Sequence, residues 1–402
     1  MLRYDEAREK VVSLVSRHRT LPDQETVSLE HSLGRILAEP ITADRDYPPF
    51  ARATRDGFAV RAADVAHVPA VLKLVGEVKP GERFTGSVGR GECVEIMTGA
   101  SLPAGADAVV MIENTELEGK LIRVKLSVRS GENVVLQGSE ARKGARLLAP
   151  GHRLGPVEFS LLAQVGKGEV KVYRRPRVAI LTTGHEVVEV GTQPNPMQIR
   201  NSNLCSLAAQ VTLSGAEPVL LGNVPDEAEA LRERIKCGLE EELLVVSGGV
   251  SVGKYDLVKE VLRGLNAEFF FDAVAMRPGR PTVFACCGER FVFGLPGNPV
   301  STLVTFELFV APAIQLLAGG VAEPLCLLKA KLSQPVRTSP GLTYFLPARL
   351  EGSADEVTVR AVPWQGGGDV VALTKSNCFL VVPETQTELA AGSWLNVLLP
   401  WS

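Results

Sequence analysis

Disulfide and zinc-site patterns are lacking in this sequence of 402 residues. The seven cysteines are scattered and form no C-x-x-C pair: Cys93, Cys205, Cys237, Cys286, Cys287, Cys326 and Cys378. Such a set excludes a disulfide framework and is typical of a reducing compartment. With five histidines and neither an H-E-x-x-H nor a G-x-S-x-G motif, zinc proteases and α/β-hydrolases have no support either. Any metal is expected to have oxygen ligands.

An excess of charge of either sign is lacking as well. Lys and Arg total 43 against 46 for Asp and Glu, a net charge of -3, which gives no electrostatic attraction for nucleic acid or an anionic membrane. No uninterrupted apolar run approaches the ~20 residues of a membrane span, and residues 1–6 are charged where a signal peptide would be apolar. We therefore expect a cytoplasmic protein that binds neither nucleic acid nor a membrane.

Aromatic residues are few, at 5%, but 45% of the residues are apolar and 22% are charged, a balance typical of globular proteins. At roughly 100 to 200 residues per domain, the length predicts two to four domains. A helix is expected over 2–18 and a β-rich domain over 47–140. Because residues 1–46 have too little apolar surface to fold alone, we expect them to pack with 141–176 as one discontinuous linking domain, which makes the β-rich domain an insertion.

Residues 177–322 are expected to form an α/β domain. Apolar strands alternate with helices in the order typical of a doubly wound, mainly parallel sheet covered on both faces. The expected strands are 178–181, 218–221, 243–246 and 291–293, and the expected helices are 202–213, 226–241, 256–264 and 299–317. The remaining residues, 323–402, contain five or six short strands with Pro and Gly turns and predict a small all-β domain.

Three loops follow the expected parallel strands. They are Thr182-Thr183-Gly184-His185-Glu186, Ser247-Gly248-Gly249-Val250-Ser251-Val252-Gly253-Lys254-Tyr255-Asp256 and Gly294-Leu295-Pro296-Gly297-Asn298-Pro299. In an open parallel sheet, ligands bind at the carboxyl ends of the strands, where glycines let the backbone approach an anion closely. Any one of these loops could be an ordinary turn, but three at one edge favour a phosphate or nucleotide site.

Charged side chains near this edge of the sheet add a metal site and an oxyanion clamp to the hypothesis of a phosphate or nucleotide site. Glu186, Asp226 and Asp256 each lie just past a strand, and carboxylates clustered beside a phosphate usually hold Mg²⁺ through oxygen. For Asp226, helix capping is an equal alternative. Arg277 and Arg280 lie on a stiff Pro-Gly turn that suits the clamping of an oxyanion, although surface salt bridges are the alternative for both.

Further motifs complete an ordered series along the chain: Asp56-Gly57-Phe58-Ala59, Ile96-Met97-Thr98-Gly99-Ala100, Gly105-Ala106-Asp107-Ala108-Val109-Val110, Thr183-Gly184-x-Glu186, Ser247-Gly248-Gly249-Val250-Ser251-Val252-Gly253 through Asp256, Met276-x-Pro278-Gly279 and Gly294-Leu295-Pro296-Gly297-Asn298-Pro299-Val300-Ser301. Over nearly the whole chain this series resembles the molybdopterin molybdenumtransferase family, known as MoeA in bacteria and as the E domain of gephyrin in animals. The resemblance implies a molybdopterin-binding type of α/β domain, a barrel-like C-terminal domain and an elongated homodimer, in which the linking domain also serves dimerisation.

The resemblance also implies a reaction. Members of the family take adenylylated molybdopterin and molybdate as substrates, hydrolyse the adenylate with Mg²⁺ to release AMP, and leave molybdenum on the finished cofactor; a molybdopterin adenylyltransferase would be the substrate donor. By motif position, five residues would be catalytic: Asp56, Thr98, Glu186, Asp226 and Asp256. The last three would also hold the metal, and Asp56 and Thr98 would reach in from the partner subunit. The substrate-binding residues would be Thr183, Gly184, Ser247, Gly248, Gly249, Ser251, Arg277, Arg280, Pro296, Gly297 and Asn298.

Several positions depart from the family's common pattern. His185 replaces an aspartate beside the expected metal ligands, and the lysines that usually flank the Pro-Gly turn are arginines here. Leu342 and Gly367 replace an arginine and a serine that are linked in relatives to the molybdate pocket, and Glu140 replaces an aspartate. We therefore expect the adenylate half of the site to follow the family more closely than the oxyanion half.

Three alternatives remain open. The upstream adenylyltransferase resembles only residues 177–320, so the rest of the chain argues against it. A paralogue that inserts tungstate would use the same arginines, and the sequence does not separate the two anions. A non-catalytic scaffold like the gephyrin E domain would bind protein partners without hydrolysing the adenylate.

Overall fold

The structure is a computed structural model of the chain, and it describes residues 1–250, 257–353 and 356–400. The chain folds into two compact units. The first, here called the sheet unit, comprises Met1–Ala38, Gly151–Gly155 and Glu169–Ser402; the second, the inserted unit, comprises Glu39–Pro150 and Pro156–Gly168. The finer division into four domains stays a prediction.

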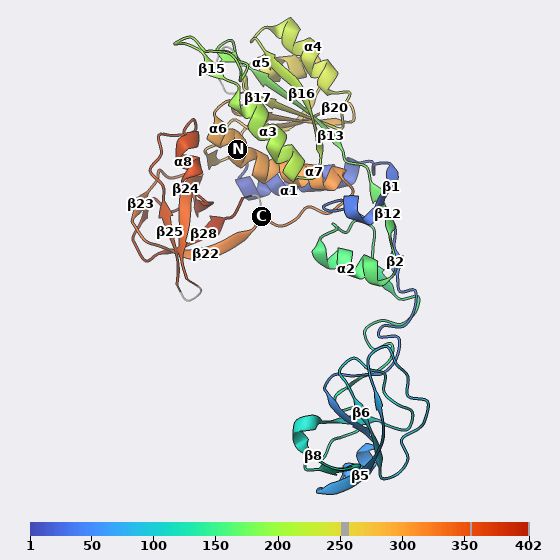
Figure 1. Ribbon diagram of the computed structural model, residues 1–402. Helices are drawn as coiled ribbons and strands as arrows, with labels where there is room; N and C mark the ends of the chain where they lie inside the picture. The colour runs from blue at the N-terminus through green and yellow to red at the C-terminus, as the bar shows by residue number, and fades with distance from the viewer. Residues whose placement is uncertain (251–256, 354–355, 401–402) are drawn as a thin grey trace. The chain divides into compact units, whose positions relative to one another are not determined.

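A six-stranded sheet organises the sheet unit (Figure 1). Its order is β16 (Glu217–Val224), β13 (Arg177–Thr183), β17 (Leu243–Ser247), β21 (Arg290–Leu295), β20 (Val283–Cys287) and β18 (Glu268–Phe271). The first four strands are parallel, as the alternation of strands and helices predicts. β20 runs antiparallel to both of its neighbours, because only Gly288 and Glu289 connect it to β21, and a parallel crossover needs a dozen or so residues.

Helices cover both faces of this sheet, which is therefore doubly wound as expected. Along β13, Val178 and Ile180 contribute to one hydrophobic cluster, whereas Ala179 and Leu181 contribute to the other, as the two-residue period of a strand requires. The first cluster includes residues of α1 (Tyr4–His18), α3 (Ser202–Leu213), α6 (Pro299–Thr305) and α7 (Ala311–Leu317), and the second includes residues of α4 (Ala228–Gly238) and α5 (Leu257–Gly264).

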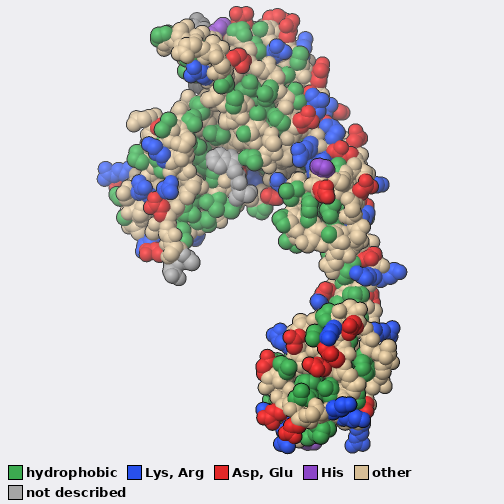
Figure 2. Space-filling view, in the orientation of Figure 1, with side chains coloured by type: hydrophobic (Ala, Val, Ile, Leu, Met, Phe, Trp, Pro, Cys, Tyr) green, Lys and Arg blue, Asp and Glu red, His purple; other side chains and the backbone are tan. Residues whose placement is uncertain are grey.

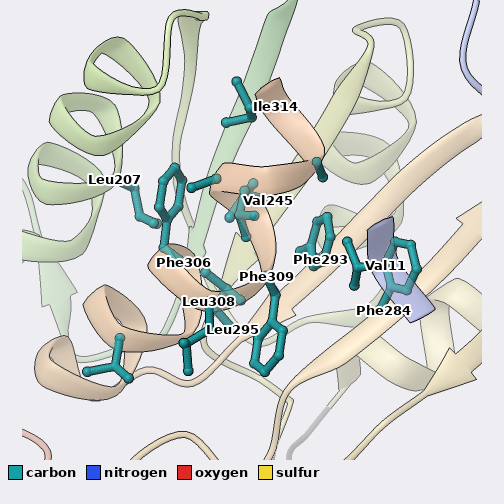
Figure 3. Packing of buried hydrophobic residues seen from close by; sticks show 14 of the residues in the cluster. Val11, Leu207, Val245, Phe284, Phe293, Leu295, Phe306, Leu308, Phe309 and Ile314 are labelled. Atoms are coloured by element: carbon teal, nitrogen blue, oxygen red, sulfur yellow. The ribbon is translucent and has the colours of Figure 1, made fainter. Parts of the chain in front are cut away.

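A long apolar helix follows β21. α6 continues through a π-helical turn into α7. By length and composition alone, Pro299–Leu317 could cross a membrane, a feature that the sequence analysis misses, but 83% of its most apolar window is buried inside the fold. Phe306 and Ile314 pack in the first cluster with Phe293 of β21 (Figure 3). We interpret this segment as the core helix of the α/β domain.

The C-terminal part of the sheet unit closes into a small β-barrel. Its strands pair in a ring, since the last also pairs with the first: β24 (Thr343–Gly352), β25 (Val357–Ala361), β22 (Leu327–Leu332), β28 (Trp394–Leu398) and β26 (Cys378–Val382). β23 (Val336–Arg337) and β27 (Glu388–Leu389) form a separate ladder. The all-β expectation is wrong for α8 (Val370–Thr374), a short helix that starts where Asp369 Oδ1 accepts a hydrogen bond of 3.0 Å from Ala372 N.

One strand from outside the barrel joins its sheet. β19 (Met276–Arg277) lies beside the start of β24 in a parallel pairing that sets Arg277 opposite Tyr344. The Pro-Gly turn that follows β19 is thereby held between the α/β domain and the barrel. This placement decides where the arginines of the turn lie.

The inserted unit contains a six-stranded sheet of its own, in the order β7 (Ala108–Met111), β4 (Gly57–Val60), β6 (Glu92–Ile96), β5 (Ala70–Val78), β9 (Leu121–Val124) and β8 (Thr115–Glu118). Phe58 and Ala59, adjacent on β4, belong to different buried clusters, so both faces of the sheet are packed. The β-rich reading of this part is confirmed, and α2 (Pro156–Gln164) follows in the same unit.

Four further two-stranded ladders occur in the described residues: β1 (Gln24–Ser28) with β12 (Glu169–Tyr173), β2 (Ile41–Thr42) with β11 (Arg146–Leu148), β3 (Arg52–Ala53) with β10 (Val134–Val135), and β14 (Val187–Val188) with β15 (Ile199–Arg200). On the face seen in Figure 2, acidic and basic side chains are interspersed over both units. This mixing agrees with the small net charge of the sequence.

Candidate active site

The carboxyl ends of the four parallel strands surround a cavity of about 690 Å³. We call it the sheet-edge cavity. Each expected loop contributes to its wall, which includes Thr183, Gly184, Asp226, Gly248, Gly249 and Gly297. The structure therefore brings together residues from the ends of β13, β16, β17 and β21, as expected for a ligand site at the edge of a parallel sheet.

Two glycines after β17 hold conformations that other residues rarely adopt. Gly248 has φ +101° and Gly249 has φ +61°. A Cβ on Gly248 would lie 2.7 Å from the carbonyl oxygen of Thr183, far inside van der Waals contact. The turn therefore needs glycine, as its sequence predicts, and it leaves peptide groups at the cavity wall for an anionic ligand.

Buried hydrogen bonds brace these loops from α3. Asn203 Nδ2 donates to Ser247 Oγ at 2.9 Å and to the Gly297 carbonyl at 2.8 Å, and Ser247 Oγ donates to the Pro296 carbonyl at 3.2 Å. The loops after β17 and β21 are thus tied to each other. Sequence analysis misses Asn203, although the capping residue Asn201 at the start of α3 is a signal that polar groups gather here.

Two of the three expected metal ligands line the sheet-edge cavity. They are Glu186, which is exposed, and Asp226, whose Oδ1 accepts a hydrogen bond from the Thr183 hydroxyl. Asp256 and Ser251 lie outside the described residues. Within the described ranges no cluster of three or more His, Cys, Asp or Glu side chains is found, so the complete ligand set stays a prediction.

A second cavity of about 370 Å³, the arginine cavity, adjoins the first. The two share Pro281, Pro296 and Asn298 as lining residues, and Arg277 and Arg280 lie in the wall of the second. Neither arginine forms an ion pair with any carboxylate of the described chain. The surface salt bridges considered above are therefore not seen, and both cations are available to an anion.

Two further departures from the family's pattern lie in the wall of the arginine cavity. Leu342 and Gly367 line it, together with Trp364, which sequence analysis does not single out. A Cβ on Gly367 would lie 2.8 Å from Ser301 Oγ, so a larger residue here requires that hydroxyl to move. Leu342, Trp364 and Gly367 thus give this cavity apolar and backbone surface beside its two arginines.

In the inserted unit, the structure brings Asp56 and Thr98 together. Asp56 Oδ1 accepts hydrogen bonds from Thr98 N at 2.6 Å and from Thr98 Oγ1 at 2.8 Å. These bonds lower the pKa of Asp56, the backbone one most. Glu140, also in this unit, forms an exposed ion pair with Arg52 at 3.1 Å. The expected part of Asp56 and Thr98 in the reaction stays a prediction.

A glycine-lined cavity at the carboxyl edge of a doubly wound sheet defines a class, the α/β proteins that bind anionic ligands there. Family models match the chain in three consecutive parts: the MoeA N-terminal region (domain I and II) over residues 2–166, a probable molybdopterin binding domain over 179–316 and the MoeA C-terminal region (domain IV) over 329–399. The chain belongs to the MoeA family.

Relatives and solved structures agree with this membership. Proteins named molybdopterin molybdenumtransferase from Bacillus subtilis (strain 168) and from Nostoc sp. (strain PCC 7120 / SAG 25.82 / UTEX 2576) are 36% and 35% identical to this chain, over 98% and 96% of it and 96% and 91% of their own lengths. A crystal structure of the molybdopterin biosynthesis MoeA protein from Pyrococcus horikoshii OT3 covers 99% of this chain and 100% of its own at 29% identity, with a TM-score of 0.81. Another MoeA structure from that species covers 98% of each chain at 34% identity, with a TM-score of 0.73.

Proposed function

We propose that this protein inserts molybdenum from molybdate into adenylylated molybdopterin and hydrolyses the adenylate to AMP. The observation that carries the proposal is the pair of adjoining cavities, of which one is lined by glycines and carboxylates and the other by unpaired arginines. A substrate that carries an adenylate at one end and receives an oxyanion at the other needs two adjoining cavities, one suited to each end.

The sheet-edge cavity takes the adenylate. Peptide groups near Gly248 and Gly249 approach its phosphates, and the hydrogen bonds from Asn203 hold the loops in position. Because binding fixes the reacting bond relative to the oxyanion, this positioning supplies part of the rate acceleration.

The donor set at this cavity suits Mg²⁺. Glu186, Asp226 and the Thr183 hydroxyl are oxygen donors, which Mg²⁺ prefers over nitrogen and sulfur. Asp256, which follows in the sequence, is the third carboxylate of the proposed set. When bound, the ion would withdraw electrons from the phosphate oxygens and so favour hydrolysis.

Arg277 and Arg280 bind molybdate in the arginine cavity. Their planar guanidinium groups offer several N–H donors each, and their positive charge balances that of the oxyanion while the adenylate is hydrolysed by water. Molybdopterin receives the metal where this cavity meets the sheet-edge cavity, beside Pro296 and Asn298.

The remaining parts of the proposal concern assembly. The protein acts as a cytoplasmic homodimer in which Asp56 and Thr98 enter the site from the partner subunit, and a molybdopterin adenylyltransferase supplies its substrate. Asp56 and Thr98 are hydrogen-bonded to each other and are both exposed on the inserted unit. This pairing supports a joint role for the two residues.

AMP release from adenylylated molybdopterin tests the proposal. The purified protein with Mg²⁺ is given molybdate, tungstate or neither. Release that depends on the oxyanion and yields active cofactor is expected, and the better anion identifies the metal that the protein inserts. No release under any of the three conditions would contradict the proposal and would favour a scaffold.

A further inference from the structure

Asn223, near the carboxyl end of β16, has no role in the proposed function and does not line the sheet-edge cavity. Leu221, two residues earlier, packs against the second hydrophobic cluster. A regular strand would therefore point Asn223 toward the same face. Instead Asn223 bonds to Thr182, which shares a face of β13 with Ile180 of the first cluster. The side chain of Asn223 is thus directed to the opposite face of the sheet.

A β-bulge in β16 causes this change of face. Ile180 of β13 lies opposite Leu220. The next residue, Leu181, lies opposite Gly222, so β16 has one extra residue between them. Gly222 has φ +81°, a conformation that glycine adopts at no steric cost. Bulges redirect side chains and are frequent beside active sites, and this one aims Asn223 at the loop after β13.

Asn223 holds that loop through its side-chain amide. Its Nδ2 donates to the Gly184 carbonyl at 2.9 Å and to the Val187 carbonyl at 3.2 Å. Its Oδ1 lies 3.1 Å from the Thr182 hydroxyl, which donates to it. These partners determine the orientation of the amide, because carbonyl oxygens can only accept. Glu186 lies between the two bonded carbonyls in the chain, so one amide fixes the turn that carries this carboxylate.

The amide is itself anchored to the start of α3. The Thr182 hydroxyl accepts a hydrogen bond of 2.8 Å from Asn201 Nδ2, and Asn201 Oδ1 accepts one of 3.1 Å from Leu204 N at the helix N-terminus. Thr182 and Asn201 are only 3% and 2% exposed. Buried polar networks whose members are bonded to one another are rigid. Asn223 therefore connects the turn to a fixed part of the fold.

The turn needs such support, because Glu186 is exposed and burial does not hold its side chain. The affinity of an oxygen-ligand site for a divalent cation depends on the rigidity of the site as well as on the charge of its ligands. Residues that orient a ligand without touching the ion commonly change metal affinity about ten- to a hundredfold when they are replaced. Asn223 holds the backbone on both sides of Glu186 and so fits this description.

We propose that Asn223 is a positioning residue for the metal site: by clamping the turn from Gly184 to Val187, it holds Glu186 in the geometry that binds Mg²⁺. The inference rests on the proposed function, because that function makes Glu186 a metal ligand. Asn223 touches neither the ion nor the substrate in this role, and it acts only through the turn.

Mn²⁺ binding tests the proposal without turnover. Mn²⁺ takes the same oxygen ligands as Mg²⁺, and its electron paramagnetic resonance signal separates free from bound ion. The purified full-length protein is titrated with Mn²⁺ in the presence of AMP, for the wild type, Asn223→Ala, Asn223→Leu, Glu186→Gln and the combination of Asn223→Ala with Glu186→Gln. Asn377→Ala is the control, since its amide bonds the backbone of Leu350 in the barrel and lines neither cavity.

Each single change at Asn223 or Glu186 should weaken Mn²⁺ binding about tenfold, whereas the control should bind as the wild type does. The combined variant should bind about as weakly as Glu186→Gln alone, because Asn223 acts through Glu186 and the two losses are therefore not additive. Asn223→Leu fills the space of the amide without its donors. Weakening in Asn223→Ala that Asn223→Leu restores would assign the effect to side-chain volume and overturn the proposal.

Two further outcomes would overturn the positioning role and leave the proposed metal site intact. One is wild-type Mn²⁺ affinity in both Asn223 variants together with a loss in Glu186→Gln. The other is a combined variant in which the two losses add. Unchanged Mn²⁺ binding in Glu186→Gln would contradict the metal site of the proposed function itself, and the positioning role with it.

Activity provides a second readout. Asn223→Ala should raise the Mg²⁺ concentration for half-maximal AMP release about tenfold. The rate at saturating Mg²⁺ should equal that of the wild type, because excess ion fills the weakened site. A fall in the saturated rate at unchanged Mg²⁺ dependence would overturn the positioning role.

Discussion

The sheet-edge cavity and the arginine cavity adjoin, yet they are built from different groups. The first depends on backbone, because Gly248 and Gly249 adopt positive φ values and buried hydrogen bonds hold their loop. The second depends on charge, which two exposed arginines supply. Under the proposed function, shape should therefore control binding of the adenylate and electrostatics binding of the oxyanion. Substitutions in each cavity test this difference.

The largest effect is expected from Gly248→Ala. The new Cβ would lie 2.7 Å from the Thr183 carbonyl oxygen in a conformation with φ +101°, so the loop must move. AMP release should fall about a hundredfold or more, as displacement of a positioning group by about 1 Å commonly does. Gly191→Ala, where no atom lies within 4 Å of the new Cβ, is the matched control. Wild-type turnover in Gly248→Ala would show that AMP release does not depend on the backbone conformation of this loop.

Arg280→Ala should come next. It removes one cation from the arginine cavity and leaves the sheet-edge cavity untouched. The molybdate concentration for half-maximal AMP release should rise about ten- to a hundredfold, while the affinity for AMP stays the same. Arg349→Ala, at an exposed arginine of β24 that pairs with Glu351 and lines neither cavity, should change neither quantity. A loss of AMP affinity in Arg280→Ala would show that the two cavities do not divide the substrate as proposed.

Asp226→Asn tests the acidic part of the sheet-edge cavity. The amide keeps the size of the side chain beside Thr183 but loses the charge. Because affinity for a hard cation depends on the charge of its ligands, the Mg²⁺ concentration for half-maximal AMP release should rise about tenfold. Glu229→Gln, on the exposed surface of α4, is the control. An unchanged Mg²⁺ dependence would contradict the assignment of Asp226 as a Mg²⁺ ligand.

A smaller effect is expected from Ser247→Ala. This change removes the hydrogen bond to the Pro296 carbonyl and the acceptor for Asn203 Nδ2, although Asn203 keeps its bond to Gly297. The free energy of unfolding should fall by about 1 kcal/mol, measured by urea denaturation. A fall in AMP affinity should accompany it, because the loop loses part of its support. Unchanged stability would mean that these bonds do not brace the loops.

The smallest effect concerns Asp56 in the inserted unit. Its pKa is lowered by hydrogen bonds from Thr98, so its stabilising contribution is present above the unfolded pKa of about 3.9 and is lost as the pH falls through the lower folded value. Thr98→Val removes the hydroxyl and should move the pKa of Asp56 part of the way back. Carboxyl-carbon NMR titration measures it, and an unmoved pKa would assign the whole shift to the backbone bond.

Much of the sheet-edge cavity could be predicted from sequence because strand order alone places it. Parallel strands end at one edge, so their glycine-rich loops meet there wherever the helices pack. The helix bounds 202–213 expected for α3 agree with the structure. The antiparallel β20 was predictable in principle, since Gly288 and Glu289 form too short a connection for a parallel strand.

The arginine cavity could be predicted only in part. The Pro-Gly turn indicated an oxyanion clamp, but the cavity also requires β19 to pair with β24 and Trp364 to contribute to its wall. These contacts join segments far apart in the sequence, and no local pattern encodes them. The same holds for Asn203, whose side chain acts through loops after β17 and β21.

The most direct test of the two-cavity account is a crystal structure of the protein with AMP and tungstate, in which anomalous scattering locates the tungsten. The AMP phosphate should lie beside Gly248 and Gly249, and the tungsten should lie between Arg277 and Arg280. Tungsten among the carboxylates of the sheet-edge cavity, or AMP bound against the arginines instead of the glycine loop, would contradict it.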